Sequence, residues 1–129
     1  MEQFTTTIKP RLYETDAMGH INNATIAAWF EVARVRFLES LVGANPMESK
    51  GWTLASVQID FLTETQYGED VAASITEAEV GNSSLRLQCL MTQGDRVTVR
   101  GKAVMVHWDP ETRAPTRIGE ELRELIAAR

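Results

Sequence analysis

The feature that most constrains the fold is a change in the spacing of apolar residues along the chain. Between residues 24 and 42, apolar side chains recur every three or four positions, which is the period of one face of an α-helix. Asn22 or Asn23 can cap this helix, and Gly43 and the Asn45-Pro46 step end it near residue 42. The sequence therefore predicts one long helix, whose buried face consists of Ile26, Phe30, Ala33, Phe37 and Leu41.

Most of the remaining chain has the period-two alternation of β-strands. A first strand is predicted over residues 5–13, before a polar loop at 14–23. The breaks between later segments are short and contain residues typical of turns, so successive strands are expected to be antiparallel neighbours. These breaks contain Gly68, Gly81-Asn82 and Gly94-Asp95. The strand segments that they separate are 53–65, 70–79, 83–92 and 96–108. A short helix is predicted over residues 119–129.

The lengths of the longest elements predict how they pack. The long helix would extend ~28 Å at 1.5 Å per residue, and the segment 96–108 would extend ~43 Å at 3.3 Å per residue. A strand of that length can curve around a helix. Residues 1–129 are therefore expected to form a single α+β domain, in which a curved antiparallel five-stranded sheet wraps around one long central helix. Cys89 has no internal disulfide partner and alternates with apolar neighbours, which predicts a small core residue.

Composition excludes some classes of partner. The chain has 13 basic and 18 acidic side chains, which disfavours binding to nucleic acid. It shows no long apolar run and no apolar leader, so we expect a cytoplasmic protein without a membrane partner. Residues 84–129 carry 8 basic and 6 acidic groups, so an anionic ligand should prefer this segment. The candidate cations there are Arg86, Arg96, Arg100, Lys102, Arg113 and Arg117.

The loop before the long helix contains groups suited to carbonyl chemistry. The first amides of a helix lack intrahelical acceptors and carry a partial positive charge, so they can stabilise an oxyanion. Asp16 can attack a carbonyl carbon or activate a water, and His20 can orient the water or the carbonyl. A loop aspartate is also a common turn former, and a loop histidine can simply bond to backbone. A metal site made of Asp16, His20 and His107 lacks cysteine support, so no metal is expected.

A family resemblance appears in the same residues. The stretch RLYETDAMGHINN at residues 11–23, followed by WFEVAR at 29–34, resembles the opening of hot-dog-fold thioesterases of the 4-hydroxybenzoyl-CoA thioesterase and acyl-CoA thioesterase type. The resemblance covers roughly residues 4–118, and it implies the hot-dog fold. Weaker similarities follow in IDFL at 59–62, YGED at 67–70 and GNSS at 81–84.

The resemblance implies an activity and a site. In that family, the aspartate at the position of Asp16 is the catalytic carboxylate, and the backbone amide at the position of Asn23 polarises the thioester carbonyl. The implied reaction is hydrolysis of acyl-CoA to a free acid and CoA, without a cofactor. The family also pairs its sheets edge to edge, so we expect a homodimer or a homotetramer. The candidate catalytic residues are Asp16, His20 and Asn23, and the candidate substrate-binding residues are Asn22, Trp29, Phe30, Phe61, Ser83, Ser84 and Arg86.

Departures from the family pattern leave several alternatives open. A bacterial subgroup has histidine at the position of Asn23 and the benzoyl-CoA enzyme has tyrosine, so the acyl group cannot be transferred from either. Met18 stands where the similar plant acyl-carrier-protein thioesterases have a catalytic asparagine. The carrier and the role of Asp16 as nucleophile or base stay undecided. Two other interpretations are a non-catalytic acyl-CoA binding or sensing domain and a hot-dog dehydratase that would use Glu31 after His20.

Overall fold

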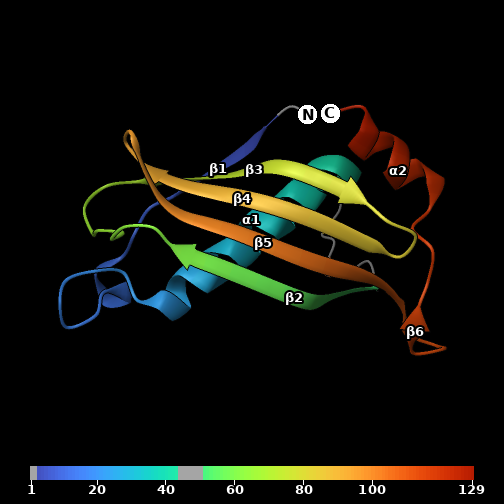
Figure 1. Cartoon of the computed structure of the whole chain (residues 1–129), viewed down its shortest axis with the longest axis horizontal. Coiled ribbons are helices and arrows are strands. Elements are labelled where there is room, and N and C mark those ends of the chain that lie inside the picture. Colours follow the sequence, from blue (N-terminus) through green and yellow to red (C-terminus); the bar gives the residue numbers. More distant parts are fainter. Residues whose placement is uncertain (1–2, 44–50) are drawn as a thin grey trace.

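The computed structural model describes residues 3–43 and 51–129. One long helix, α1, lies across one face of a sheet of long strands, and a short helix, α2, follows the last strand (Figure 1). The elements are β1 (Phe4–Ile8), the 3-10 turn η1 (Leu12–Glu14), α1 (Asn23–Val42), β2 (Trp52–Phe61), β3 (Val71–Val80), β4 (Ser84–Gln93), β5 (Arg96–Asp109), β6 (Ala114–Pro115) and α2 (Glu120–Ala127).

The strand order in the sheet is β1-β3-β4-β5-β2, and every pairing is antiparallel. The short turns that join β3 to β4 and β4 to β5 are confirmed. However, β2 pairs with β5 rather than with β3, so the prediction that β2 and β3 are neighbours was wrong. The connection through Gly68 is a crossing segment and not a hairpin turn. The small strand β6, which pairs with the end of β5, was not predicted.

Gln93 explains why the connection between β2 and β3 crosses the molecule. Its side chain is buried, and its Nε2 donates hydrogen bonds to the carbonyl oxygens of Gln66 (2.7 Å) and Glu69 (2.9 Å). Its Oε1 accepts a hydrogen bond from Gln66 N at 2.9 Å. These bonds satisfy the backbone of the segment without a strand partner. The segment also lies beside the loop that precedes α1, joined to it by the hydrogen bond from Ile21 N to Thr65 O (2.9 Å) and by an isolated bridge between His20 and Gln66.

The first strand and β2 are shorter than predicted. β1 ends at Ile8, two residues before Pro10, which has no N–H to donate to a sheet. Residues 12–14 then form η1 in place of a strand. β2 ends at Phe61, and residues beyond it belong to the crossing segment that Gln93 binds.

Helix α1 agrees with its prediction. Asn22 is the N-cap, whose side chain accepts a hydrogen bond from Ala24 N at 2.8 Å, and Gly43 ends the helix in the left-handed conformation at φ 72°. Four of the five predicted face residues are buried, and Leu41 is half-buried. Within the described ranges, no helix is long and apolar enough to cross a membrane.

The close packing of α1 on the sheet depends on a glycine in β5. A Cβ atom at Gly101 would lie 2.6 Å from Cε2 of Phe30, closer than carbon atoms approach in proteins. On the neighbouring strand, Cys89 is 1% exposed, which confirms the prediction of a core residue. Burial raises the pKa of its thiol to about 12.

One strand leaves its concave face uncovered. Leu54, Val57 and Phe61 of β2 are 43%, 46% and 47% exposed, and we call these three residues the β2 stripe. Their partners across the ladder to β5 are buried in the core, so the β2 stripe faces the same side of the sheet as the core. Because β2 is also an edge strand, a free backbone edge adjoins this exposed apolar surface.

Candidate active site

The loop between η1 and α1 is organised around the side chain of Asp16. Asp16 Oδ1 accepts hydrogen bonds from Met18 N (2.8 Å) and His20 N (3.1 Å), and Gly19 has the positive φ of 81° that the turn requires. Asp16 N donates to His20 O at 2.7 Å. Oδ1 of Asp16 therefore stabilises the turn. The other carboxylate oxygen, Oδ2, accepts no hydrogen bond from the residues that the structure describes.

Two backbone N–H groups in the first turn of α1 have no hydrogen-bond acceptor among the described residues. The side chain of Asn22 accepts from Ala24 N, and the carbonyl oxygen of Asn22 accepts from Ile26 N at 3.1 Å. Within residues 3–43 and 51–129, nothing accepts a hydrogen bond from Asn23 N or Thr25 N. The N–H of Asn23 therefore combines an unused hydrogen bond with the positive end of a 20-residue helix.

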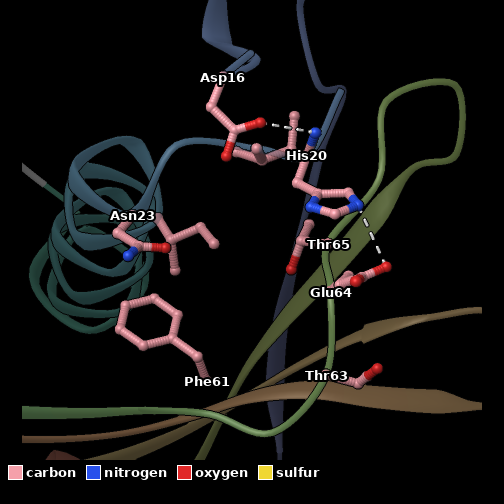
Figure 2. Close-up of a pocket in the computed structure, with 9 residues that line it drawn as sticks. Asp16, His20, Asn23, Phe61, Thr63, Glu64 and Thr65 are labelled. Atoms are coloured by element: carbon pink, nitrogen blue, oxygen red, sulfur yellow. Dashed lines mark hydrogen bonds and ion pairs between the residues drawn. The ribbon is translucent and has the colours of Figure 1, made fainter. Parts of the chain in front are cut away.

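Asp16 and Asn23 line one cavity of about 530 Å³. Figure 2 shows Asp16 above the start of α1, with Asn23 and His20 on opposite sides of the hollow and Phe61 below. Six of the nine lining residues are polar, and the three apolar ones, Ile21, Ile26 and Phe61, come from the loop, α1 and β2. The other lining residues are Ile21, Ile26, Thr63, Glu64 and Thr65.

The ring of His20 is fixed by an acid that the sequence did not indicate. His20 Nε2 lies 3.2 Å from Oε2 of Glu64, and Figure 2 shows this contact at the side of the cavity. Glu64 lies on the crossing segment, which was predicted to be the end of a strand. Only the strand order brings Glu64 to His20, so no local pattern could have identified it.

Three predicted binding residues make structural contacts within the chain. Trp29 is buried, and its Nε1 donates to Oε2 of Glu14 at 3.2 Å, which connects α1 to η1. Phe30 is 1% exposed and packs on Gly101. Asn22 is the helix cap. None of the three lines the cavity of one chain, so their role as substrate contacts stays a prediction beside these packing and capping contacts.

The remaining predicted binding residues are separated from the cavity in one chain, except Phe61, which lines it. Ser83 and Ser84 lie at the β3–β4 turn, at the opposite end of the sheet from the Asp16 loop (Figure 1). Arg86 lines a different groove, on the outer face of the sheet. Among the predicted cations, Arg96 contacts the cavity wall, because its Nη1 donates to the carbonyl oxygen of Glu64 at 3.2 Å.

Comparison with known proteins assigns the chain to a family. A profile of the thioesterase-like superfamily matches residues 10–126. The chain belongs to this superfamily. The predicted relationship to hot-dog thioesterases is thereby confirmed.

Individual relatives agree with the family. The chain is 31% identical over 83 residues to the uncharacterized protein YsmA of Bacillus subtilis strain 168; the match covers 64% of this chain and 56% of that protein, little more than half its length. The fold is similar to a "predicted thioesterase" from Bacillus stearothermophilus, with 29% identity, a TM-score of 0.91 and coverage of 98% and 96% of the two chains. It is also similar to a thioesterase of Thermus thermophilus complexed with coenzyme A and Zn, with 27% identity, a TM-score of 0.86 and coverage of 96% and 91%. In the part of this chain that the structure describes, no three His, Cys, Asp or Glu side chains form a metal-binding group.

Proposed function

We propose that this chain hydrolyses an acyl-CoA thioester to a free acid and CoA. The observation that carries the proposal is that a carboxylate oxygen of Asp16 and the N–H of Asn23, both without partners among the described residues, border one cavity. Membership of the thioesterase-like superfamily supports the reaction class. The coenzyme A bound to the Thermus thermophilus thioesterase supports CoA as the carrier.

The proposed chemistry needs one hydrogen-bond donor that stabilises negative charge on the carbonyl oxygen, and one base or nucleophile. The thioester oxygen accepts a hydrogen bond from Asn23 N–H, which stabilises the charge that develops as the carbonyl carbon becomes tetrahedral. Asp16 Oδ2 either removes a proton from the water that attacks this carbon, or attacks the carbon itself and forms a mixed anhydride that water hydrolyses. In both routes the C–S bond breaks and the sulfur leaves as the CoA thiol. His20, fixed by Glu64, orients the water or the carbonyl.

The acyl group needs a covered groove, and we propose that a second chain provides the cover. The β2 stripe is exposed although it faces the core side of the sheet, and Phe61 of this stripe also lines the cavity. A homodimer formed along the free edge of β2 would bury this apolar surface and extend the cavity. Association of two such dimers into a homotetramer stays a prediction, as does the cytoplasmic location.

The CoA phosphates need cations near the mouth of the cavity. We propose Arg96, since its Nη1 contacts the backbone of Glu64, a lining residue of the cavity; a phosphate would compete with Glu69, whose Oε1 lies 3.5 Å from Nη2 of Arg96. A guanidinium can bind phosphate with two parallel hydrogen bonds. Replacement of Arg96 by methionine is expected to raise KM for acyl-CoA more than it lowers kcat.

A thiol-release assay with a panel of acyl-CoAs tests the proposal. Wild type should release CoA from at least one acyl-CoA, and Asp16→Asn should be slower by about a hundredfold or more. Asparagine keeps the Oδ1 acceptor that shapes the loop, so the loss reports the chemistry and not the fold. Unchanged turnover in Asp16→Asn would exclude Asp16 as the catalytic group. Acyl-CoA binding without release of thiol would instead favour a sensing domain.

An isotope experiment tests the nucleophilic role of Asp16. In a single turnover in water labelled with ¹⁸O, a mixed anhydride that water attacks on its Asp16 side leaves the label in the Asp16 carboxylate, which establishes the nucleophile. A general-base route, like an anhydride that water attacks on its acyl side, places the label only in the product acid. Mass analysis of the peptide that contains Asp16 measures the difference. The dehydratase interpretation gains no support, because Glu31 does not line the cavity.

A further inference from the structure

Arg34 is a charged residue in the interior of the chain. It is 4% exposed, and its guanidinium carbon lies 4.5 Å from the centre of the Phe30 ring. Its Nε and Nη1 atoms are enclosed and donate no hydrogen bond to any described residue. Arginine keeps its charge at physiological pH, and a buried charge without a partner is strongly destabilising. Among the described residues of one chain, this guanidinium therefore has no counter-ion and no hydrogen-bond acceptor for Nε and Nη1.

Glu31 is the acid whose charge acts on Arg34, but the two do not pair within the chain. Burial lowers the pKa of Arg34, and the charge of Glu31, one helical turn earlier, opposes this effect. Arg34 is buried, whereas Glu31 is exposed, and no ion pair between described residues involves either of them. A buried cation and an exposed carboxylate thus lie three residues apart on one helix, without forming an ion pair among the described residues.

The surface around Glu31 can receive a second helix. Ala24, Ala27 and Ala28 are exposed on the same flank of α1, and small side chains let two helices approach closely. At the amino end of this flank, Asn23 shares a cavity with Phe61 of β2 (Figure 2). The flank is therefore continuous with the β2 stripe, the apolar surface that one chain leaves open.

We propose that a second copy of this chain covers this flank across a two-fold axis, and that Glu31 of each copy forms an ion pair with Arg34 of the other. A two-fold axis perpendicular to the helices makes them antiparallel, so position 31 of one faces position 34 of the other when the axis passes between these positions. The contact is isologous, and the ion pair forms twice. Each carboxylate then places a negative charge beside the buried guanidinium, and the charges fix the register of the two helices.

The inference rests on the two-chain assembly proposed above and not on thioester hydrolysis. Its test uses Glu31→Gln and Arg34→Met, each made in a full-length chain with a different affinity tag. Each homodimer of a variant lacks both ion pairs. A mixed dimer, however, has one intact pair, because its wild-type Glu31 and wild-type Arg34 belong to different copies. Glu39→Gln is the matched control, since Glu39 contacts Arg36 at 3.5 Å on the solvent side of the same helix.

Sedimentation and native mass spectrometry provide the readout. We expect wild type and Glu39→Gln to be equally tight assemblies, and Glu31→Gln and Arg34→Met to dissociate at concentrations about tenfold higher or more. After mixing and subunit exchange, mixed dimers should exceed the statistical half of all dimers. A statistical distribution would overturn the ion pair alone, whereas a monomeric wild type would overturn the assembly as well. If Arg34→Met does not fold by itself, both chains are produced together; a folded mixed dimer supports the pair, and its absence contradicts it.

Discussion

Replacement of Asn23 by proline removes one hydrogen-bond donor from the proposed site and leaves the helix in place. Asn23 is the first residue of α1, a position where proline is favoured because its N–H has no intrahelical acceptor. The residue before a proline must be extended, and Asn22 already has φ −59° and ψ 138°. We therefore expect the free energy of unfolding to change by less than about 1 kcal/mol.

Activity should respond very differently. The N–H of Asn23 has no acceptor among the described residues, so it is available to the thioester oxygen. Loss of one such donor typically lowers kcat by about 10²–10³-fold, or about 2.7–4 kcal/mol of transition-state stabilisation. The assay is thiol release from acyl-CoA at several substrate concentrations, so that kcat and KM are measured separately, together with urea unfolding of the same preparation.

Asn23→Ala is the matched control for this experiment. It removes the side chain but keeps the backbone N–H, and it should retain most of the wild-type turnover. The reasoning is refuted if Asn23→Pro folds normally and hydrolyses acyl-CoA at the wild-type rate, or if Asn23→Ala loses as much activity as Asn23→Pro. The second result would assign the function of this position to its side chain.

Three further predictions concern stability. Asp16→Ala leaves two loop amides without their acceptor, so urea unfolding should show a stability about 1–2 kcal/mol below that of Asp16→Asn; equal stabilities would contradict the bracing role of Oδ1. Gly101→Ala places a methyl group 2.6 Å from the Phe30 ring and should cost about 1–3 kcal/mol, part of which Phe30→Leu in the same chain recovers. Burial raises the pKa of Cys89 from 9.0 to about 12, so the thiol ionises first in the unfolded chain and stability should fall with rising pH above about 9, by roughly 1 kcal/mol near pH 10. Cys89→Ala should remove this part of the pH dependence, and native Cys89 should react with thiol reagents only as fast as the chain opens.

The sequence predicted the elements whose patterns are local. The helix face, its Asn22 cap and its end at Gly43 follow from spacing and from single-residue preferences, and the structure confirms them. The hairpins of β3, β4 and β5 follow from their short turns. The position of β2 at the far edge could not be predicted from a glycine in a short connection, because it depends on pairing with β5, which is distant in sequence, and on a connection that the side chain of Gln93 stabilises.

In the candidate site, too, the residues on one local segment were predictable, whereas those brought in by the strand order were not. Asp16, His20 and Asn23 lie on one loop and one helix start, and the structure brings them to one cavity. Glu64 was missed, since the strand order alone brings it to His20. The structural contact of Trp29 could not be predicted, because an aromatic residue near a reactive loop can contact substrate or support the loop equally well in sequence. Its bond to Glu14 shows that here it supports the loop.

The double use of the Asp16 carboxylate limits how this position can evolve. Oδ1 closes a tight turn with the amide two residues later, which needs an acceptor on a side chain as short as aspartate or asparagine. Glutamate has the same charge and nearly the same acidity, but its extra methylene group displaces the oxygens from that amide. The choice between the two acids at this position is thus a matter of loop geometry, and a lineage that exchanged them would have to rebuild residues 16–20 at the same time.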